Sequence, residues 1–297
     1  MHPVPVEPHP SLGRVPAPLI FVVSGLTQYL GAAIAVGLFT QLAPAPLAWL
    51  RVLVAAGVLL VWRRPWRLRW TRRDLGVAVL FGIALGLMNV TFYVAIDHLP
   101  LGTAVAIEFL GPVAVAAVTG SGWRDRAGIV LAAAGVALLA GVTLSLGRED
   151  ARIGLMAIGA AAACWAAYIL LGRRVAARGD GVTRLSVAMS AGAIVLAPFF
   201  VRSSTPVLGS WTLAAAVVGV AVLSSVVPYA LEQVVLRRVP PATFAVLLAL
   251  LPATAAVVGA VVLRQWPHPL DLAGLLLVSG AIALTAVRTK SSPQVVP

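Results

Sequence analysis

The chain has 297 residues, of which 60% are hydrophobic and 11% are charged, and its mean hydropathy of +0.98 excludes an ordinary soluble domain. The formal net charge of +12 would suit a nucleic-acid binder, but such proteins gather Lys and Arg on one polar face, whereas here the basic residues separate long apolar runs. The single cysteine, Cys164, excludes a disulfide framework within the chain and a thiolate metal cluster. We therefore expect an integral membrane protein.

The first apolar run follows a Pro-rich leader, residues 1–17. No small-residue cleavage site comes after it, so we interpret it as a retained helix. A helix needs about 20 apolar residues to cross about 30 Å of hydrocarbon. Ten segments meet this need, at residues 18–39, 44–62, 74–95, 100–119, 126–146, 152–172, 184–201, 211–236, 240–262 and 268–287. The sequence thus predicts an all-α protein with ten transmembrane helices.

The connections between these segments alternate in charge. Seventeen Lys and Arg residues lie in the leader, the tail and every second connection, and the segment 63–73, RRPWRLRWTRR, holds six of them. The other connections hold four, namely Arg148, Arg152, Arg202 and Arg264. Cytoplasmic loops carry the excess of Lys and Arg, so both termini are expected in the cytoplasm, which requires an even number of spans. Trp66 and Trp70 in the Arg-rich segment would also suit a nucleic-acid patch, but interfacial Trp beside Arg is more typical of a membrane edge.

A weak internal repeat relates the two halves of the chain. PLGTAVAIEFLGPVA, which begins at Pro100, and PPATFAVLLALLPAT, which begins at Pro240, match at a constant offset of 140 residues. They belong to the fourth and ninth spans, and five spans per half is an odd number, so the second half is predicted to insert upside down. The expected division is a leader at 1–17, repeats at 18–146 and 152–287, and a tail at 288–297. Chance similarity of two Ala/Val-rich helices is the alternative.

Four motifs in this order, PLGTAVAIEFLGPVAVA, AACWAAYILLGRR, VLSSVVPYALE and LRRVPPATFAVLL, resemble the EamA-type transporters of the drug/metabolite transporter superfamily. Most similar are the inner-membrane threonine/homoserine exporters, and the resemblance extends over nearly all ten spans. It implies two inverted five-helix repeats in the bacterial cytoplasmic membrane, cytoplasmic termini, and export of small amino acids or related metabolites.

Two positions differ from the pattern of these exporters. Family members usually carry a Glu just before the proline of the ninth span and a Gly-Glu pair after that span, where this chain has Leu251-Pro252 and Arg264-Gln265. The missing acid leaves the substrate open. Fold does not determine substrate, so an exporter of drugs or other small metabolites is the alternative function.

Glu108 is the one charged residue in the stretch GTAVAIEFLGPVAVAA, residues 102–117. It lies about 12 Å along a helix from Pro100, near the middle of the membrane. A charge there costs at least about 2.5 kcal/mol, so Glu108 is expected to face a cavity or a partner. It could pair with a substrate ammonium or hold a coupling proton, since burial favours the neutral form of a carboxyl group. The alternative is a structural acid that locks two helices together.

Arg51 lies about 10 Å inside the second span, and the resemblance places an Arg there in many relatives. Its guanidinium could bind a substrate carboxylate, or it could tie helices together through exposed carbonyls. Further polar or aromatic side chains within the spans are candidates for binding substrate, with ordinary packing as the alternative: Asn89, Tyr93, Trp165, Tyr168 and Tyr229.

Two other polar groups lie near the ends of predicted spans. Glu232 precedes Arg237 by five residues and is interpreted as an interfacial residue or a local ion pair. Asp97 and His98 are expected in a solvated turn between the third and fourth spans.

Glycine and proline positions predict features of the helices themselves. Gly82 and Gly86 form a GxxxG pair, which favours close packing of helices. Pro112 and Pro252 are expected to loosen their helices and free carbonyl groups in the membrane.

No motif in the sequence indicates an enzyme. The Gly-x-x-x-x-Gly-Lys-Ser/Thr phosphate loop and the HExxH zinc motif are absent, and the four histidines lie at or near polar ends. We therefore expect a secondary exporter that works by alternating access, driven by an ion or exchange gradient, with no catalytic residue, metal or cofactor. Its expected partners are a small-molecule substrate, membrane lipid and a coupling proton, with no nucleic acid, and the sequence is compatible with a homodimer.

Overall fold

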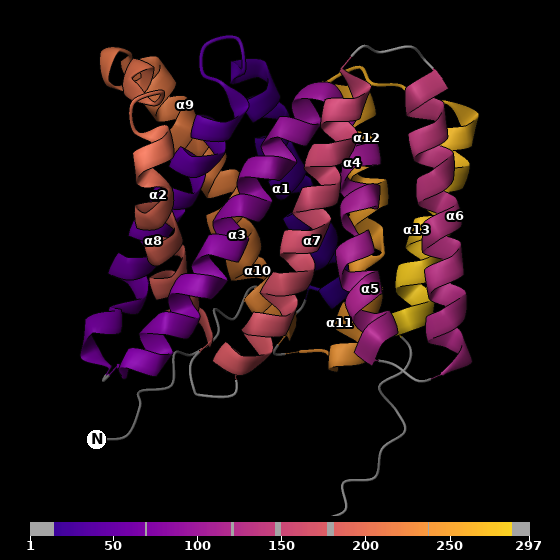
Figure 1. Ribbon diagram of the computed structural model, residues 1–297, viewed down its shortest axis with the longest axis horizontal. Helices are drawn as coiled ribbons and strands as arrows, with labels where there is room; N and C mark the ends of the chain where they lie inside the picture. The colour runs from indigo at the N-terminus through magenta and orange to yellow at the C-terminus, as the bar shows by residue number, and fades with distance from the viewer. Residues whose placement is uncertain are drawn as a thin grey trace, which may run out of the picture.

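The computed structural model describes residues 15–68, 70–119, 122–145, 150–176, 181–236 and 238–286. Every regular element in these ranges is a helix, and the ranges contain no strand (Figure 1). Eight helices are long and apolar enough to cross a membrane, and two shorter apolar helical stretches lie among them. The prediction of an all-α membrane protein is confirmed.

Seven of the predicted spans form continuous α-helices. They are α1 Ala17–Leu38, α2 Pro44–Arg63, α3 Arg72–His98, α6 Trp123–Ser145, α7 Ala151–Ala176, α8 Gly181–Phe200 and α13 Pro269–Ala286. Short 3-10 helices, η2 Pro65–Arg67 and η3 Thr205–Gly209, follow α2 and α8. Helix α3 includes Asp97 and His98, where the sequence predicts a turn, and the His98 ring Nδ1 lies 2.9 Å from the Val94 carbonyl of the preceding turn.

The other three spans are interrupted helices. The fourth consists of α4 Leu101–Glu108 and α5 Leu110–Thr119, and the ninth consists of α11 Pro241–Leu248 and α12 Leu250–Val262. The eighth consists of α9 Trp211–Ala221, the π-helical turn η4 Val222–Val226, and α10 Val227–Leu236.

Prolines account for the interruptions of the fourth and ninth spans. Pro112 and Pro252 have no N–H to donate to the carbonyls four residues earlier, those of Glu108 and Leu248, and their rings crowd those carbonyls. The helices break at the next residues, Phe109 and Ala249, which separate α4 from α5 and α11 from α12. The loosening predicted at the two prolines is thus confirmed.

The two breaks have the same backbone geometry. Phe109 has φ −63° and ψ −10°, and Ala249, 140 positions later, has φ −64° and ψ −15°. The residues that precede the broken spans also match, with φ −57° and ψ 140° at Pro100 and φ −57° and ψ 150° at Pro240. A weak sequence match therefore corresponds to a close match in local structure.

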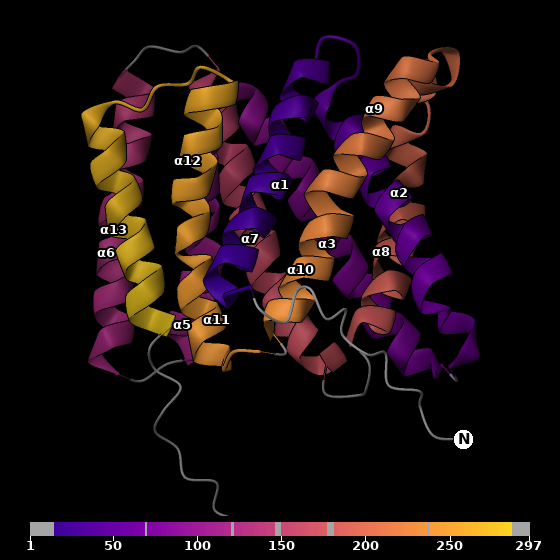
Figure 2. The ribbon, with the colours of Figure 1, turned by 180° about the vertical axis from the view of Figure 1, so that it is seen from behind.

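The helices form one bundle in which neighbours in space are often distant in sequence. Helices α6 and α13 lie side by side at one edge, while α2, α8 and α9 lie towards the other (Figures 1 and 2). Helix α1 packs in the centre against α10 and α12, and α3 packs against α7 and α8. Helix α1 begins and α13 ends at one end of the bundle, here called the terminal end (Figure 2).

Glycine allows the backbones of α3 and α8 to touch. A Cβ atom on Gly82 would overlap the carbonyl group of Ala188, and one on Gly192 would overlap the backbone of Gly82. A Cβ on Gly86 would lie 2.6 Å from a methyl group of Leu196. The close packing predicted from the Gly82/Gly86 pair is confirmed, because any larger residue would force the helices apart.

We expect Gly82→Ala to destabilise the folded bundle by about 1–3 kcal/mol, because the added methyl group must push α8 away. Gly76→Ala, in the same helix but facing open space, is the matched control and should be neutral or stabilising by up to about 1 kcal/mol. Thermal unfolding of both purified variants in detergent measures the difference. Equal unfolding temperatures would contradict the contact between α3 and α8.

Candidate functional site

A cavity of about 110 Å³ lies where six segments meet: α1, α2, α3, α4, η4 and α10. Its polar lining is Gln28, Tyr29, Arg51, Asn89, Glu108, Ser224, Tyr229 and Glu232. Four of the residues selected from the sequence are among them, namely Arg51, Asn89, Glu108 and Tyr229. The fold therefore gathers charged and hydrogen-bonding groups from both halves of the chain around one small space.

Glu108 is the last residue of α4 and lies next to the break at Phe109. Only 9% of its surface is exposed. Because Glu108 lines the cavity, a solute in the cavity can contact its carboxylate. Within the described part of the chain no hydrogen bond or ion pair reaches this carboxylate, although the charge of Arg51 is close enough to act on it. Glu108 is thus a buried acid whose carboxylate is available to accept hydrogen bonds or to pair with a cation.

Arg51 is held on one side by Tyr93 of α3. Its Nη1 donates a hydrogen bond to the Tyr93 hydroxyl at 3.2 Å, and its guanidinium carbon lies 4.8 Å from the centroid of the Tyr93 ring. Its Nε is buried and has no acceptor among the described residues. A guanidinium with an unused donor that lines a small cavity is suited to bind an anionic group.

The other candidates from the sequence have different surroundings. Asn89 donates through Nδ2 to the Leu85 carbonyl at 2.7 Å, which leaves its side-chain oxygen to accept a hydrogen bond in the cavity. Tyr93 is completely buried beneath Arg51 and orients it, but it is not part of the lining.

Trp165 and Tyr168, both on α7, pack against other aromatic residues and do not line the cavity. Trp165 contacts Phe109 edge-on, with ring centroids 4.7 Å apart, and Tyr168 stacks on Phe81 at 4.6 Å. Helix α7 packs mainly against α3 and α5, so these rings fill helix interfaces.

Glu232 is the main residue of the cavity that sequence reasoning placed elsewhere. It lines the cavity beside Tyr229, three residues earlier on α10, and its Oε1 accepts a hydrogen bond from the Ser24 hydroxyl at 3.4 Å. Its suggested partner Arg237 lies outside the described residues. Its position near the predicted end of a span suggested the membrane interface, and only the contact of α10 with α1 brings it inward.

Gln28 and Tyr29 of α1 also line the cavity, although the sequence gave no reason to select them. Tyr29 is 3% exposed and lies close enough to Glu108 and Glu232 to interact electrostatically with both carboxylates. The only sequence signal is the spacing of Ser24 and Gln28, four residues apart on one face of an otherwise apolar helix.

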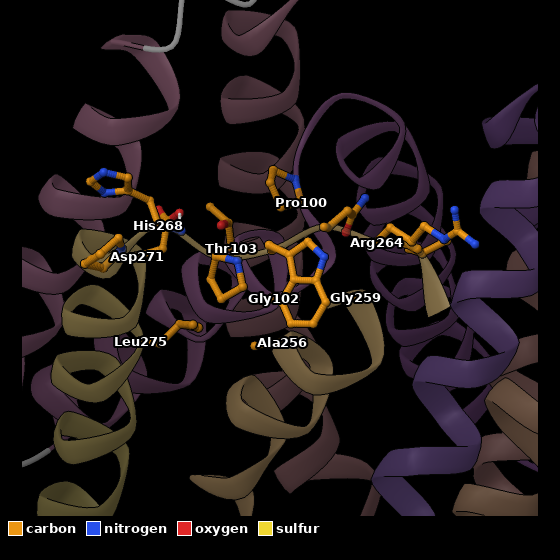
Figure 3. A pocket seen from close by; sticks show the side chains of 14 residues that line it. Pro100, Gly102, Thr103, Ala256, Gly259, Arg264, His268, Asp271 and Leu275 are labelled. Carbon is orange, nitrogen blue, oxygen red and sulfur yellow. Dashed lines mark hydrogen bonds between the residues drawn. The ribbon is translucent and has the colours of Figure 1, made fainter. Parts of the chain in front are cut away.

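A larger pocket of about 790 Å³ opens at the end of the bundle opposite the terminal end, between the start of α4 and the connection from α12 to α13 (Figure 3). Two of its polar side chains, those of Gln265 and Asp271, bond the starts of helices. The Leu101 N–H donates to Gln265 Oε1 at 2.9 Å, and the His268 N–H donates to Asp271 Oδ2 at 2.9 Å. In Figure 3 the Arg264 side chain points away from Asp271. Gln265, one of the two departures from the exporter pattern, therefore caps α4.

Comparison with known proteins agrees with this architecture. The sequence model of the EamA-like transporter family matches residues 152–287. The threonine/homoserine exporter RhtA of Escherichia coli (strain K12) is 32% identical over 290 residues, which cover 95% of this chain and 96% of that protein. The exporter of the same name from Salmonella typhimurium (strain LT2) is 32% identical over 277 residues, or 93% of each chain. The chain belongs to the EamA-like transporter family.

As a member of the EamA-like transporter family, the protein is a multi-pass membrane protein of a transporter family rather than of an enzyme family. The resemblance seen in the sequence motifs is confirmed. A solved crystal structure with a TM-score of 0.57 and 18% identity covers 90% of this chain and 95% of that one, which shows that the two share a fold.

Proposed function

We propose that this protein exports small amino acids, of the threonine and homoserine kind, across the bacterial cytoplasmic membrane by alternating access around the cavity that contains Glu108 and Arg51. The observation that carries this proposal is the presence of a buried carboxylate and a guanidinium with an unused donor in one small cavity. An α-amino acid presents an ammonium and a carboxylate on the same carbon atom, so it complements this pair of charges.

The size of the cavity favours a small solute. At about 30 Å³ per water molecule, 110 Å³ corresponds to only a few waters. Pockets for drug-sized molecules occupy about 300–1,000 Å³. The alternative, an exporter of drugs or other metabolites, would require this site to expand considerably. The names of the relatives at 32% identity support the same choice, since both are threonine/homoserine exporters.

We further infer that residues 18–146 and 152–287 are two inverted repeats of five spans, between a leader at 1–17 and a tail at 288–297. The matching breaks at Phe109 and Ala249 support this division. The packing supports it too, because a two-fold axis brings counterpart helices near the axis together and repeats every other contact between the two halves. In the bundle α2 packs on α8, α4 on α12 and α6 on α13, and the contact of α3 with α7 has its counterpart in the contact of α10 with α1.

Such an arrangement suits alternating access. In transporters with inverted repeats the substrate site lies at the interface of the repeats and near helix breaks, and one repeat rocks against the other. Here the cavity takes Glu108 from the break in the fourth span and Ser224 from the π-helical turn in the eighth. No phosphate loop occurs in the sequence, so the energy source we propose is a gradient, with a proton bound by an acid of the cavity as the candidate coupling ion.

Transport by the purified protein in liposomes tests the proposed function. A panel of labelled amino acids, with and without an imposed pH gradient, should show export of threonine or homoserine above that of large or aromatic solutes. Export of bulky drugs at comparable rates, with no amino-acid transport, would select the alternative function.

We expect the terminal end of the bundle to face the cytoplasm, because the end of α2 and the start of α3, which flank the Arg-rich connection, lie there. In a Cys164→Ala background, a cysteine at Leu68 should react with a membrane-impermeant reagent only from the cytoplasmic side. A cysteine at Leu208, exposed in η3 at the opposite end, is the matched control and should react from outside. Labelling in the reverse pattern would overturn the orientation.

Glu108→Gln should fold and insert but lose gradient-driven export by at least about tenfold, because the swap keeps shape and hydrogen bonding while it removes the charge and the titratable proton. Asp97→Asn removes an acid with a 40% exposed side chain at the end of α3 and serves as the control. Export rates are compared in liposomes at equal protein content. A wild-type rate and pH response in Glu108→Gln would leave Glu108 as a structural acid.

Arg51→Ala should weaken substrate binding by at least about tenfold, because a hydrogen bond to a charged group is worth about 1.5–3 kcal/mol. Its effect on folding should be smaller, since among the described residues Arg51 bonds only to Tyr93. Arg51→Lys should also bind poorly because it lacks the planar fork of donors. Binding and thermal unfolding are measured on the same preparations. A variant that unfolds at a much lower temperature yet binds normally would assign Arg51 to structure.

A further inference from the structure

The cavity holds two acids and one base. Arg51 supplies one positive charge, whereas Glu108 and Glu232 can supply two negative charges, and all three line the same space of about 110 Å³. Two carboxylates in one poorly solvated site oppose each other's ionisation, while a nearby cation favours it. The charges of the empty cavity therefore balance only if one of the two acids is protonated.

The two acids have different neighbours. Glu108 lies within the electrostatic range of Arg51, whereas the contact made by Glu232 is with the Ser24 hydroxyl. Adjacent positive and negative anchors suit an α-amino acid, whose two charged groups are attached to one carbon. Arg51 and Glu108 form such a pair, and Glu232 is left without a cation of its own among the described residues.

Ser24 gives Glu232 a hydrogen-bond partner that can serve both of its protonation states. Ser24 is 1% exposed, and its hydroxyl lies 3.4 Å from Glu232 Oε1 and 3.5 Å from the Pro228 carbonyl oxygen. A hydroxyl has one proton to donate and lone pairs to accept with. It can donate to an ionised Glu232, or turn to the Pro228 carbonyl and accept the proton of a neutral Glu232.

Among the residues that the structure describes, the remaining surroundings of Glu232 contain no second base. Helix α1 contributes Tyr29, α10 itself contributes Tyr229, and α7 brings Tyr168 within electrostatic range. Helix α11, which also contacts α10, has no titratable side chain in its sequence, PATFAVLL. The ionisation of the Glu232 carboxyl group therefore depends on the charged groups of the solute that enters the cavity.

We propose that Glu232 carries the proton that is exchanged for the substrate, while Glu108 and Arg51 hold the ammonium and the carboxylate of the amino acid. This inference rests on the proposed function. In the empty cavity the Glu232 carboxyl is protonated. When an amino acid enters from the cytoplasm, its ammonium favours ionisation, the O–H bond of Glu232 breaks, and the proton passes to water on the cytoplasmic side. After the solute leaves on the outer side, a proton from the outer water restores the carboxyl group.

This assignment gives the second half of the chain an acid that the ninth span lacks. Leu248, the counterpart of Glu108 at the offset of 140 residues, cannot take up a proton. Glu232 reaches the same cavity from the eighth span instead. Exchange of one proton for one net-neutral amino acid would let the pH gradient drive export.

The test uses the full chain in liposomes with labelled L-threonine and a trapped pH-sensitive dye, so that threonine counterflow and proton movement are both measured. Glu232→Gln should lose threonine-driven proton movement by at least about tenfold, while threonine counterflow falls much less. Glu108→Gln should lose both. Asp97→Asn, an exposed acid at a helix end, should lose neither. Proton movement that persists in folded Glu232→Gln, or loss of its counterflow together with its proton movement, would overturn the assignment.

A milder variant keeps the assignment testable if Glu232→Gln fails to fold. Ser24→Ala removes a hydroxyl whose hydrogen bond to ionised Glu232 is stronger than its bond to neutral Glu232, so the pH dependence of threonine-driven proton movement should shift towards higher pH. Thr27→Val removes a hydroxyl of α1 that bonds only the Ser24 carbonyl of its own helix, at 2.8 Å, and should leave the profile in place. Identical profiles in Ser24→Ala and wild type would overturn the role of Glu232. Absence of threonine counterflow in the wild type would instead overturn the proposed function.

Discussion

Charged side chains inside membrane-spanning helices constrain the rest of this structure. A charge at the centre of the bilayer costs at least about 2.5 kcal/mol, so Glu108 and Arg51 require a space sheltered from lipid. Helices α1, α2, α3, α4 and α10 provide that space between them, and Tyr93 holds Arg51 in place. The cavity is small because it is bounded by packed helices, and it is polar because these few side chains all point into it.

Helix interruptions border the same cavity. Pro112 leaves the Glu108 carbonyl without its helical N–H partner, and the helix breaks one residue later, at Phe109. The π-helical turn η4 also presents Ser224 to the cavity, and it precedes Pro228. Irregular backbone within a membrane is tolerated where protein buries it or where it borders a cavity, and both conditions are met here.

Close packing holds the helices around the cavity together, although no hydrophobic driving force acts between helices in a membrane. Lipid tails are as apolar as the helix surfaces, so association depends on shape and on a few hydrogen bonds. Gly82 and Gly192 bring α3 and α8 into backbone contact, and the Trp49 Nε1 donates to the Ala193 carbonyl at 2.8 Å to join α2 to α8. Gln265 ties the α12–α13 connection to the start of α4 in the same way.

The sequence by itself determined the helices, because hydrocarbon thickness sets their length and each must bond its own backbone. It also identified Glu108 and Arg51, since an isolated charge in an apolar run stands out, and it indicated both proline breaks. Only the tertiary structure decided which side chains meet. Glu232 and Tyr29 join the cavity, whereas Trp165 and Tyr168 pack against other rings. The physical reason is that a membrane helix is apolar on every side, towards lipid and towards its neighbours alike, so its composition does not tell which face turns inward.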